Sequence, residues 1–193
     1  MKRSILNVLS LLPFILVPTI NDVRASMVST SFSTQQVSTQ ERTMAQLTKE
    51  VRHELLMLPF YSVFDWLQFE VKSDGTVILS GQVTRPTLKT DAENVITRIE
   101  GVESVVNQIE VLPLSPNDDR IRRAVYRALF NYGSPLFRYS MGAVPPIHII
   151  VKNGHVTLKG YVDRKADADL AYMRARSVPG IFDVKNELAV GRS

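Results

Sequence analysis

The sequence contains no cysteine, one tryptophan and three histidines among its 193 residues. Without cysteine the chain cannot form disulfides, thiolate metal sites, a lipoprotein anchor or a cysteine nucleophile. The histidines His53, His148 and His155 do not have the spacing of zinc ligands. We therefore expect no metal site.

Excess charge and catalytic motifs are also scarce. The formal net charge is only +4, and the sequence has no zinc-finger, phosphate-binding-loop or arginine-rich signature, so we expect neither a nucleic-acid partner nor a cofactor. No Ser-His-Asp set with a nucleophile-elbow motif occurs, and the carboxylates are placed as in turns and helix starts. These absences predict a protein that is not an enzyme.

The first 25 residues have the layout of a signal peptide. Lys2 and Arg3 precede a short apolar run at residues 5–17, and a small residue, Ala25, stands where a peptidase would cut. An uncleaved anchor is the alternative, but the run is shorter than the roughly 20 residues that a spanning helix needs. The sequence therefore predicts export, with cleavage after Ala25.

The rest of the chain is similar to itself. Residues 69–83 match residues 149–162 with one residue fewer in the turn, and the match continues without a gap to Val111 and Val190. Upstream, each copy has four apolar residues at helical spacing. These are Leu47, Val51, Leu55 and Leu58 in the first copy and Ile121, Val125, Leu129 and Tyr132 in the second. The pattern indicates a duplicated domain.

The repeat boundaries predict the domain organisation. Pro113 and Pro116 mark a short linker, because proline cannot lie inside a helix or a central strand. We predict a signal peptide at 1–25, a flexible leader rich in Ser, Thr and Gln at 26–45, a first domain at 46–112, a linker at 113–116, a second domain at 117–190 and a tail at 191–193.

Each copy has the pattern helix, strand, strand, helix, strand. Asn153-Gly154 is typical of a two-residue hairpin turn, in which both positions favour positive φ. The predicted fold class is α+β, with two tandem αββαβ modules, each a three-stranded mixed sheet packed against two helices. Turns and helix ends also account for the shared glycines, with ligand approach to the backbone as the alternative. These glycines are Gly81, Gly101, Gly160 and Gly180.

Short motifs at equivalent places carry a family resemblance. They are Leu79-Ser80-Gly81-Gln82-Val83 and Gly101-Val102-Glu103-Ser104-Val105 in the first copy, and Leu158-Lys159-Gly160-Tyr161-Val162 and Gly180-Ile181-Phe182-Asp183-Val184 in the second. In this ordered set each copy resembles the BON domain, named for bacterial osmotic-shock and nodulation proteins. The resemblance implies a protein of the periplasm or envelope, similar to osmotically inducible periplasmic proteins. It also implies a binding role, toward phospholipid or in attaching larger proteins to membranes.

The opening helix of the second copy offers a candidate lipid-binding surface. If Ile121, Val125 and Leu129 are buried, a 100° step per residue places Tyr126 and Phe130 on the other side, beside arginines. Aromatic rings can enter the interfacial zone of a membrane while guanidinium groups bond to phosphates. The predicted binding residues are Arg122, Tyr126, Arg127 and Phe130 on the helix and Phe137, Arg138 and Tyr139 in the following loop.

Packing is the alternative explanation for the two helical aromatic residues. Two small modules gain stability by sharing buried surface, so Tyr126 and Phe130 could instead pack against the first copy. The corresponding functional alternative to phospholipid binding is an adaptor that holds another envelope protein. Binding to anionic lipid that weakens with salt distinguishes the two hypotheses.

Overall fold

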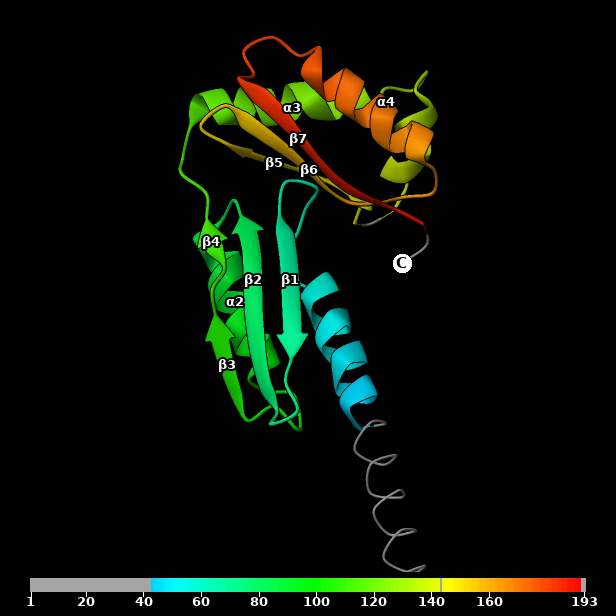
Figure 1. Cartoon of the computed structure of the whole chain (residues 1–193). Helices are drawn as coiled ribbons and strands as arrows, with labels where there is room; N and C mark the ends of the chain where they lie inside the picture. Colours follow the sequence, from blue (N-terminus) through cyan, green and yellow to red (C-terminus); the bar gives the residue numbers. More distant parts are fainter. Residues whose placement is uncertain (1–42, 143, 192–193) are drawn as a thin grey trace, which may run out of the picture. The chain divides into compact units, whose positions relative to one another are not determined.

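Two copies of one element order follow each other in the computed structural model, which describes residues 43–142 and 144–191 (Figure 1). The first copy consists of an opening helix whose described part spans 43–56, β1 (Trp66–Val71), β2 (Thr76–Val83), α2 (Pro86–Ile96), β3 (Ser104–Asn107) and β4 (Glu110–Val111). The second consists of α3 (Pro116–Leu129), the 3-10 helix η1 (Pro135–Ser140), β5 (Ile147–Lys152), β6 (His155–Val162), α4 (Lys165–Arg176) and β7 (Asp183–Val190). The predicted α+β class and tandem αββαβ order are confirmed.

The opening helix begins earlier than the sequence-based boundary of the first domain. Its residues 43–45 are helical, although they belong to the segment predicted as a flexible leader. The hydroxyl of Thr48 donates to the carbonyl oxygen of Met44 at 2.8 Å, a bond across one helical turn. The predicted signal peptide and the rest of the leader lie outside the described residues.

Both copies form the same small mixed sheet. β1 pairs antiparallel with β2, and β3 and β4, which are two parts of one interrupted strand, pair parallel with β2. In the second copy β5 pairs antiparallel with β6, and β6 pairs parallel with β7. Figure 1 shows α3 and α4 together on one face of the β5–β6–β7 sheet. One edge strand in each copy, β1 or β5, is therefore paired on one side only within its sheet.

The helical spacing read from the sequence selects the buried residues. Leu47, Val51 and Leu55 belong to the first core, and Ile121, Val125 and Leu129 are fully buried in the second. The last aligned pair differs, since Leu58 is buried whereas Tyr132 is 89% exposed. Both positions lie beyond the ends of their helices, at residue 56 and at Leu129, so helical spacing determines the burial of neither.

Helix α3 begins where its sequence provides a cap. The hydroxyl oxygen of Ser115 accepts a hydrogen bond from the amide of Asp118, and Pro116 occupies the first turn, where its missing N–H is not needed. The Asp118 carboxylate then accepts the amides of Asn153 and Gly154, each at 2.8 Å. Asp118 therefore fixes the predicted hairpin turn to the start of the helix.

A segment of the first copy contributes to the core of the second. Val63 is buried among the second core's residues, with Phe64 packed against them. The amide of Ile149 on β5 donates to the carbonyl oxygen of Val63 at 2.8 Å. An ion pair between Lys152 and Glu110 adds a polar contact at 2.5 Å. The loop between the opening helix and β1 therefore covers part of the open edge of β5.

Candidate functional site

The arginines predicted on α3 have different environments. Arg122 is buried, where its guanidinium donates to the carbonyl oxygen of Val151 at 2.7 Å and pairs with Asp119 at 2.6 Å. Arg127 is exposed. Arg122 thus bonds to the end of β5 and to its own helix, and only Arg127 of this pair faces solvent.

The aromatic residues predicted on α3 pack inward. Phe130 is buried and Tyr126 half-buried, with their ring centroids 5.1 Å apart. Tyr126 also meets Phe64 of the first copy edge to face, at 6.2 Å between centroids. This is the contact with the first copy that the packing alternative predicted for Tyr126. Phe130 follows the last helical residue and has non-helical dihedrals, so the 100° rule did not apply to it.

Two of the predicted loop residues, Arg138 and Tyr139, form a hydrogen-bond network with Asp167. Tyr139 is buried, and Phe137 is half-buried. The guanidinium of Arg138 donates to the hydroxyl of Tyr139 and to the Asp167 carboxylate, each at 2.7 Å, while the Tyr139 hydroxyl donates to Asp167 at 2.9 Å. Of the seven predicted site residues, Arg122, Phe130 and Tyr139 are buried, and the exposed ones, Arg127 and Arg138, are arginines without an exposed aromatic partner among the seven.

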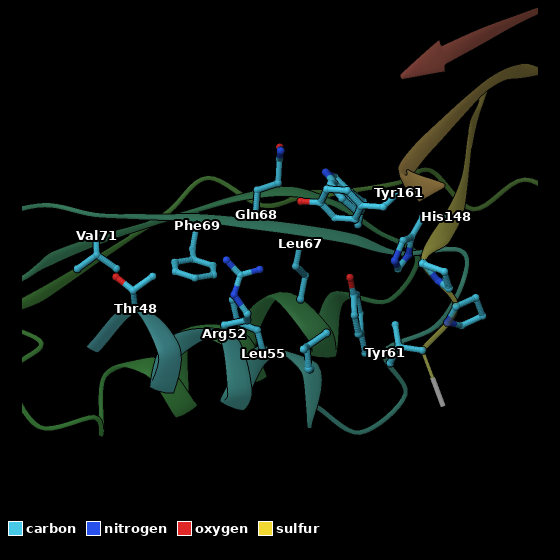
Figure 2. Close-up of a pocket in the computed structure, with 15 residues that line it drawn as sticks. Thr48, Arg52, Leu55, Tyr61, Leu67, Gln68, Phe69, Val71, His148 and Tyr161 are labelled. Carbon is cyan, nitrogen blue, oxygen red and sulfur yellow. The ribbon is translucent and has the colours of Figure 1, made fainter. Parts of the chain in front are cut away.

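An open groove lies between the opening helix and β1 of the first copy and is also lined by Pro146, His148 and Tyr161 of the second. Its floor carries Leu55 from the helix and Leu67, Phe69 and Val71 from alternate positions of β1, and its volume is about 600 Å³. Figure 2 shows these β1 side chains directed toward the helix and Arg52 rising from the helix between them. The Arg52 guanidinium lies 5.7 Å from the centroid of the Phe69 ring. We call this feature the β1 groove.

Beside the groove, the end of the opening helix exposes three large apolar side chains. Leu56, Met57 and Phe60 are 48%, 66% and 67% exposed, and we call them the apolar tip. Phe60 has φ 67, a left-handed conformation that is unfavourable for a bulky side chain. The Arg85 guanidinium stacks over the Phe60 ring at 4.8 Å. Strain in an exposed aromatic residue, without burial to offset it, is typical of functional positions.

An aromatic cluster closes one end of the groove. The ring of His148 on β5 lies 5.0 Å from Trp66 and 5.7 Å from Tyr61, and its Nδ1 atom is buried without a hydrogen-bond partner among the described residues. Burial lowers the pKa of His148, although the backbones of Asp65 and Ser62 and the charge of Asp65 oppose this. Burial also raises the pKa of Tyr61 to about 12. The cluster is therefore uncharged near neutral pH.

The buried imidazole predicts a loss of stability in acid. Because the pKa of His148 is lower in the folded chain than its usual 6.5, the unfolded chain binds the proton more readily. Its contribution to stability is complete above pH 6.5 and declines as the pH falls toward the lowered pKa. We expect urea unfolding to show a smaller drop toward about pH 5 in His148→Gln than in the natural protein. The exposed control His53→Gln should retain the full drop, and equal drops in the two variants would contradict this origin.

The sequence prediction missed the apolar tip. A signal was present, since residues 55–60 read Leu-Leu-Met-Leu-Pro-Phe. So many consecutive apolar residues cannot all lie on the buried stripe of one helix, which spans only part of its circumference. Some of them therefore had to face solvent or another surface.

The family of the chain follows from this repeated architecture and from a family model. The model of the BON domain matches residues 43–113 and residues 117–192. The chain belongs to the BON domain family and carries two tandem BON domains. BON domains are non-catalytic binding domains associated with phospholipid and with proteins of the periplasm and envelope.

Two solved structures are similar to the chain at low identity. One is described as CdsD, a structural protein of the type III secretion system of Chlamydia trachomatis, with 14% identity, 75% of this chain and 92% of that chain covered, and a TM-score of 0.29. The other is the C-terminal domain of the same protein, with 15% identity, coverage of 75% and 96%, and a TM-score of 0.28. No curated protein matches the sequence.

Two kinds of feature, a membrane-spanning helix and a metal-binding cluster, are absent from the described residues. No helix within residues 43–142 and 144–191 combines the length and apolarity needed to cross a bilayer. The same ranges contain no group of three or more His, Cys, Asp or Glu side chains able to hold a metal ion.

Proposed function

We propose that this protein binds phospholipid membrane surfaces in the cell envelope through the apolar tip of its first BON domain. The observation that carries the proposal is the exposure of Leu56, Met57 and Phe60, together with the strained backbone of Phe60. Large apolar side chains that protrude together can enter the boundary between headgroups and acyl chains. The burial of Phe130 and Tyr139 gives the surface around α3 less apolar area for the same purpose.

Two arginines next to the tip provide the polar part of such a site. Arg52 precedes Leu56 by one helical turn, so the two side chains share a helix face. Arg85 is held over the Phe60 ring. Guanidinium groups bond phosphate oxygens in a fork geometry, and arginine stems can lie along apolar surface while the charge stays in water. The tip therefore combines apolar anchors with phosphate-binding groups, which favours anionic phospholipid.

Removal of the exposed ring should weaken membrane binding. For the chain from Ser26 onward, we expect Phe60→Ser to reduce sedimentation with phosphatidylglycerol vesicles about tenfold, because burying a phenylalanine side chain contributes about 1.5–3 kcal/mol. Arg52→Gln and Arg85→Gln should reduce binding further at low salt and little at high salt, since salt screens surface charge.

A matched control lies in the second domain. Phe182 is 77% exposed, so Phe182→Ser removes a comparable ring from another surface and should leave vesicle binding unchanged. Equal losses for Phe60→Ser and Phe182→Ser would indicate unspecific adsorption. Unchanged binding for Phe60→Ser would contradict the assignment to the apolar tip.

The cellular setting is part of the same proposal. The predicted signal peptide and the envelope association of BON domains support export to the periplasm, with a role there in osmotic or envelope stress. A second function, the holding of another envelope protein, is supported by a different observation, the open β1 groove.

A further inference from the structure

The two edge strands β1 and β5 occupy equivalent places but differ in what covers them. The side chains of Ile147, Ile149 and Val151 on β5 are fully buried. Their counterparts Leu67, Phe69 and Val71 on β1 are only half-buried and line the open β1 groove. The duplicated fold therefore presents one covered and one uncovered version of the same edge.

The direction of the backbone groups on both edges follows from the strand register. In an antiparallel pair, every second residue bonds to the partner strand, and the residues between direct their N–H and C=O groups to the other side. Lys72 donates to the carbonyl oxygen of Thr76 at 2.9 Å, and Tyr161 donates to that of Pro146 at 2.9 Å. With the observed registers, the outward groups belong to residues 67, 69 and 71 on β1 and to residues 147, 149 and 151 on β5.

The second domain shows what covers such an edge. The outward amide of Ile149 donates to the backbone carbonyl of Val63, whose side chain is buried in the second core. In the first domain the Leu67 backbone lies next to the Tyr61 hydroxyl. For the outward backbone groups of Phe69 and Val71, residues 43–142 and 144–191 provide no partner. An acyl chain could fill the groove but could not bond to these groups, whereas a peptide backbone can do both.

Charge indicates one further property of the occupant. Arg52 reaches into the groove, and within the described ranges no carboxylate forms an ion pair with it. Its guanidinium can accept a carboxylate in a bidentate pair. A groove lined by Leu67, Phe69 and Val71 with one arginine at its centre fits alternate apolar side chains interrupted by an acidic one.

We infer that the β1 groove binds an extended segment of a partner protein, which adds a strand to the edge of β1. Strand addition gains affinity from main-chain hydrogen bonds and specificity from pockets for every second side chain. The segment has apolar side chains at alternate positions with an acidic residue opposite Arg52. This activity shares Arg52 with the proposed membrane site but does not require the apolar tip.

The experiment uses a synthetic probe whose groove-facing positions are known. In an added antiparallel strand, the residues directly opposite Phe69 and Val71 form hydrogen bonds with them. The side chains of these residues point to the groove side. The probe acetyl-Thr-Val-Thr-Val-Thr-Glu-Thr-Val-Thr-amide places Val and Glu at these positions. Titrated into the chain from Ser26 onward, it should slow hydrogen exchange of the Phe69 and Val71 amides about tenfold. The amides of Glu70 and Lys72 already bond to β2 and should not change.

Modified probes and matched variants decide the outcome. N-methylation of the probe's valines keeps the side chains but removes the donors, and should weaken binding at least tenfold; equal binding would overturn strand addition. Arg52→Glu should weaken binding of the Glu probe and be rescued by a probe with Lys in its place. Phe69→Ser should weaken binding, while Glu70→Ser on the opposite face of β1 should not. Slowed exchange with a lysophospholipid instead of the probe would also overturn the inference, and Phe60→Ser should not affect probe binding.

Discussion

Gly81→Ala is expected to lower the free energy of unfolding of the first BON domain by about 3–5 kcal/mol. A Cβ atom at Gly81 would meet the backbone carbonyl oxygen of Trp66 closer than the 3.0 Å below which real Cβ atoms essentially never approach. Gly81 also has φ +123, where side chains are rarely accommodated. A backbone clash between paired strands and an unfavourable φ each cost about 1–3 kcal/mol. Because single domains are stable by only about 5–15 kcal/mol, the loss is a large share.

The single tryptophan provides the measurement. Trp66 lies on β1 opposite this region of β2, so urea unfolding followed by its fluorescence reports on the first domain. Gly101→Ala is the control, since Gly101 has φ +89 but no atom within 4 Å of a built Cβ. It should lose only about 1 kcal/mol, the cost of the backbone conformation alone. Losses of equal size at Gly81 and Gly101 would show that the strand contact is unimportant.

The same constraint recurs in the second domain. A Cβ atom at Gly160 would meet the backbone carbonyl oxygen of Pro146, and Gly160 has φ +111. Gly81 and Gly160 therefore do the same structural work at equivalent places in β2 and β6. The alternative that these glycines serve ligand approach is not needed to explain their presence. Duplication has preserved the close approach of two strands rather than a binding loop.

Much of the fold could be predicted because it depends on local periodicity. The hairpin turn follows from Asn153-Gly154, which have φ 53 and φ 81, the left-handed conformations this turn requires. The buried stripes of the opening helix and α3 follow from the spacing of Leu47, Val51 and Leu55 and of their counterparts. The repeat supports the same assignment in two independent segments, since both copies share one element order.

The surface could not be predicted in the same way, because it depends on contacts distant in sequence. Periodicity placed Phe130 on an outer helix face, but α3 ends one residue earlier and the ring turns into the core. Nothing local to Val63 indicates that it is buried in the other domain. The exposure of the apolar tip also depends on contacts distant in sequence. The length of the apolar run indicates that some of its residues lie outside the core, but only the fold shows that Met57 and Phe60 are among them.

Asp65→Ala is expected to reduce the free energy of unfolding by about 3 kcal/mol or more. Asp65 is fully buried, and its carboxylate accepts four hydrogen bonds, which is close to its full capacity. The donors are the amide and hydroxyl of Ser62, at 3.1 and 2.6 Å, and the amide and hydroxyl of Thr84, at 2.7 and 2.8 Å. Hydrogen bonds to a charged group contribute about 1.5–3 kcal/mol, and buried donors left without a partner add to the loss.

Loss of the Asp65 carboxylate should also affect the second domain. The carboxylate ties residues 62–65 to the end of β2, and Val63 within this loop covers the amide of Ile149 in the second domain. Asp65→Ala should therefore also accelerate hydrogen exchange at Ile149. Asp65→Asn retains one acceptor oxygen and should show about half the loss in stability. Asp74→Ala, in the exposed turn after β1, serves as the control. If Ile149 exchanged no faster in Asp65→Ala despite the loss of stability, the two domains would be joined without help from this loop.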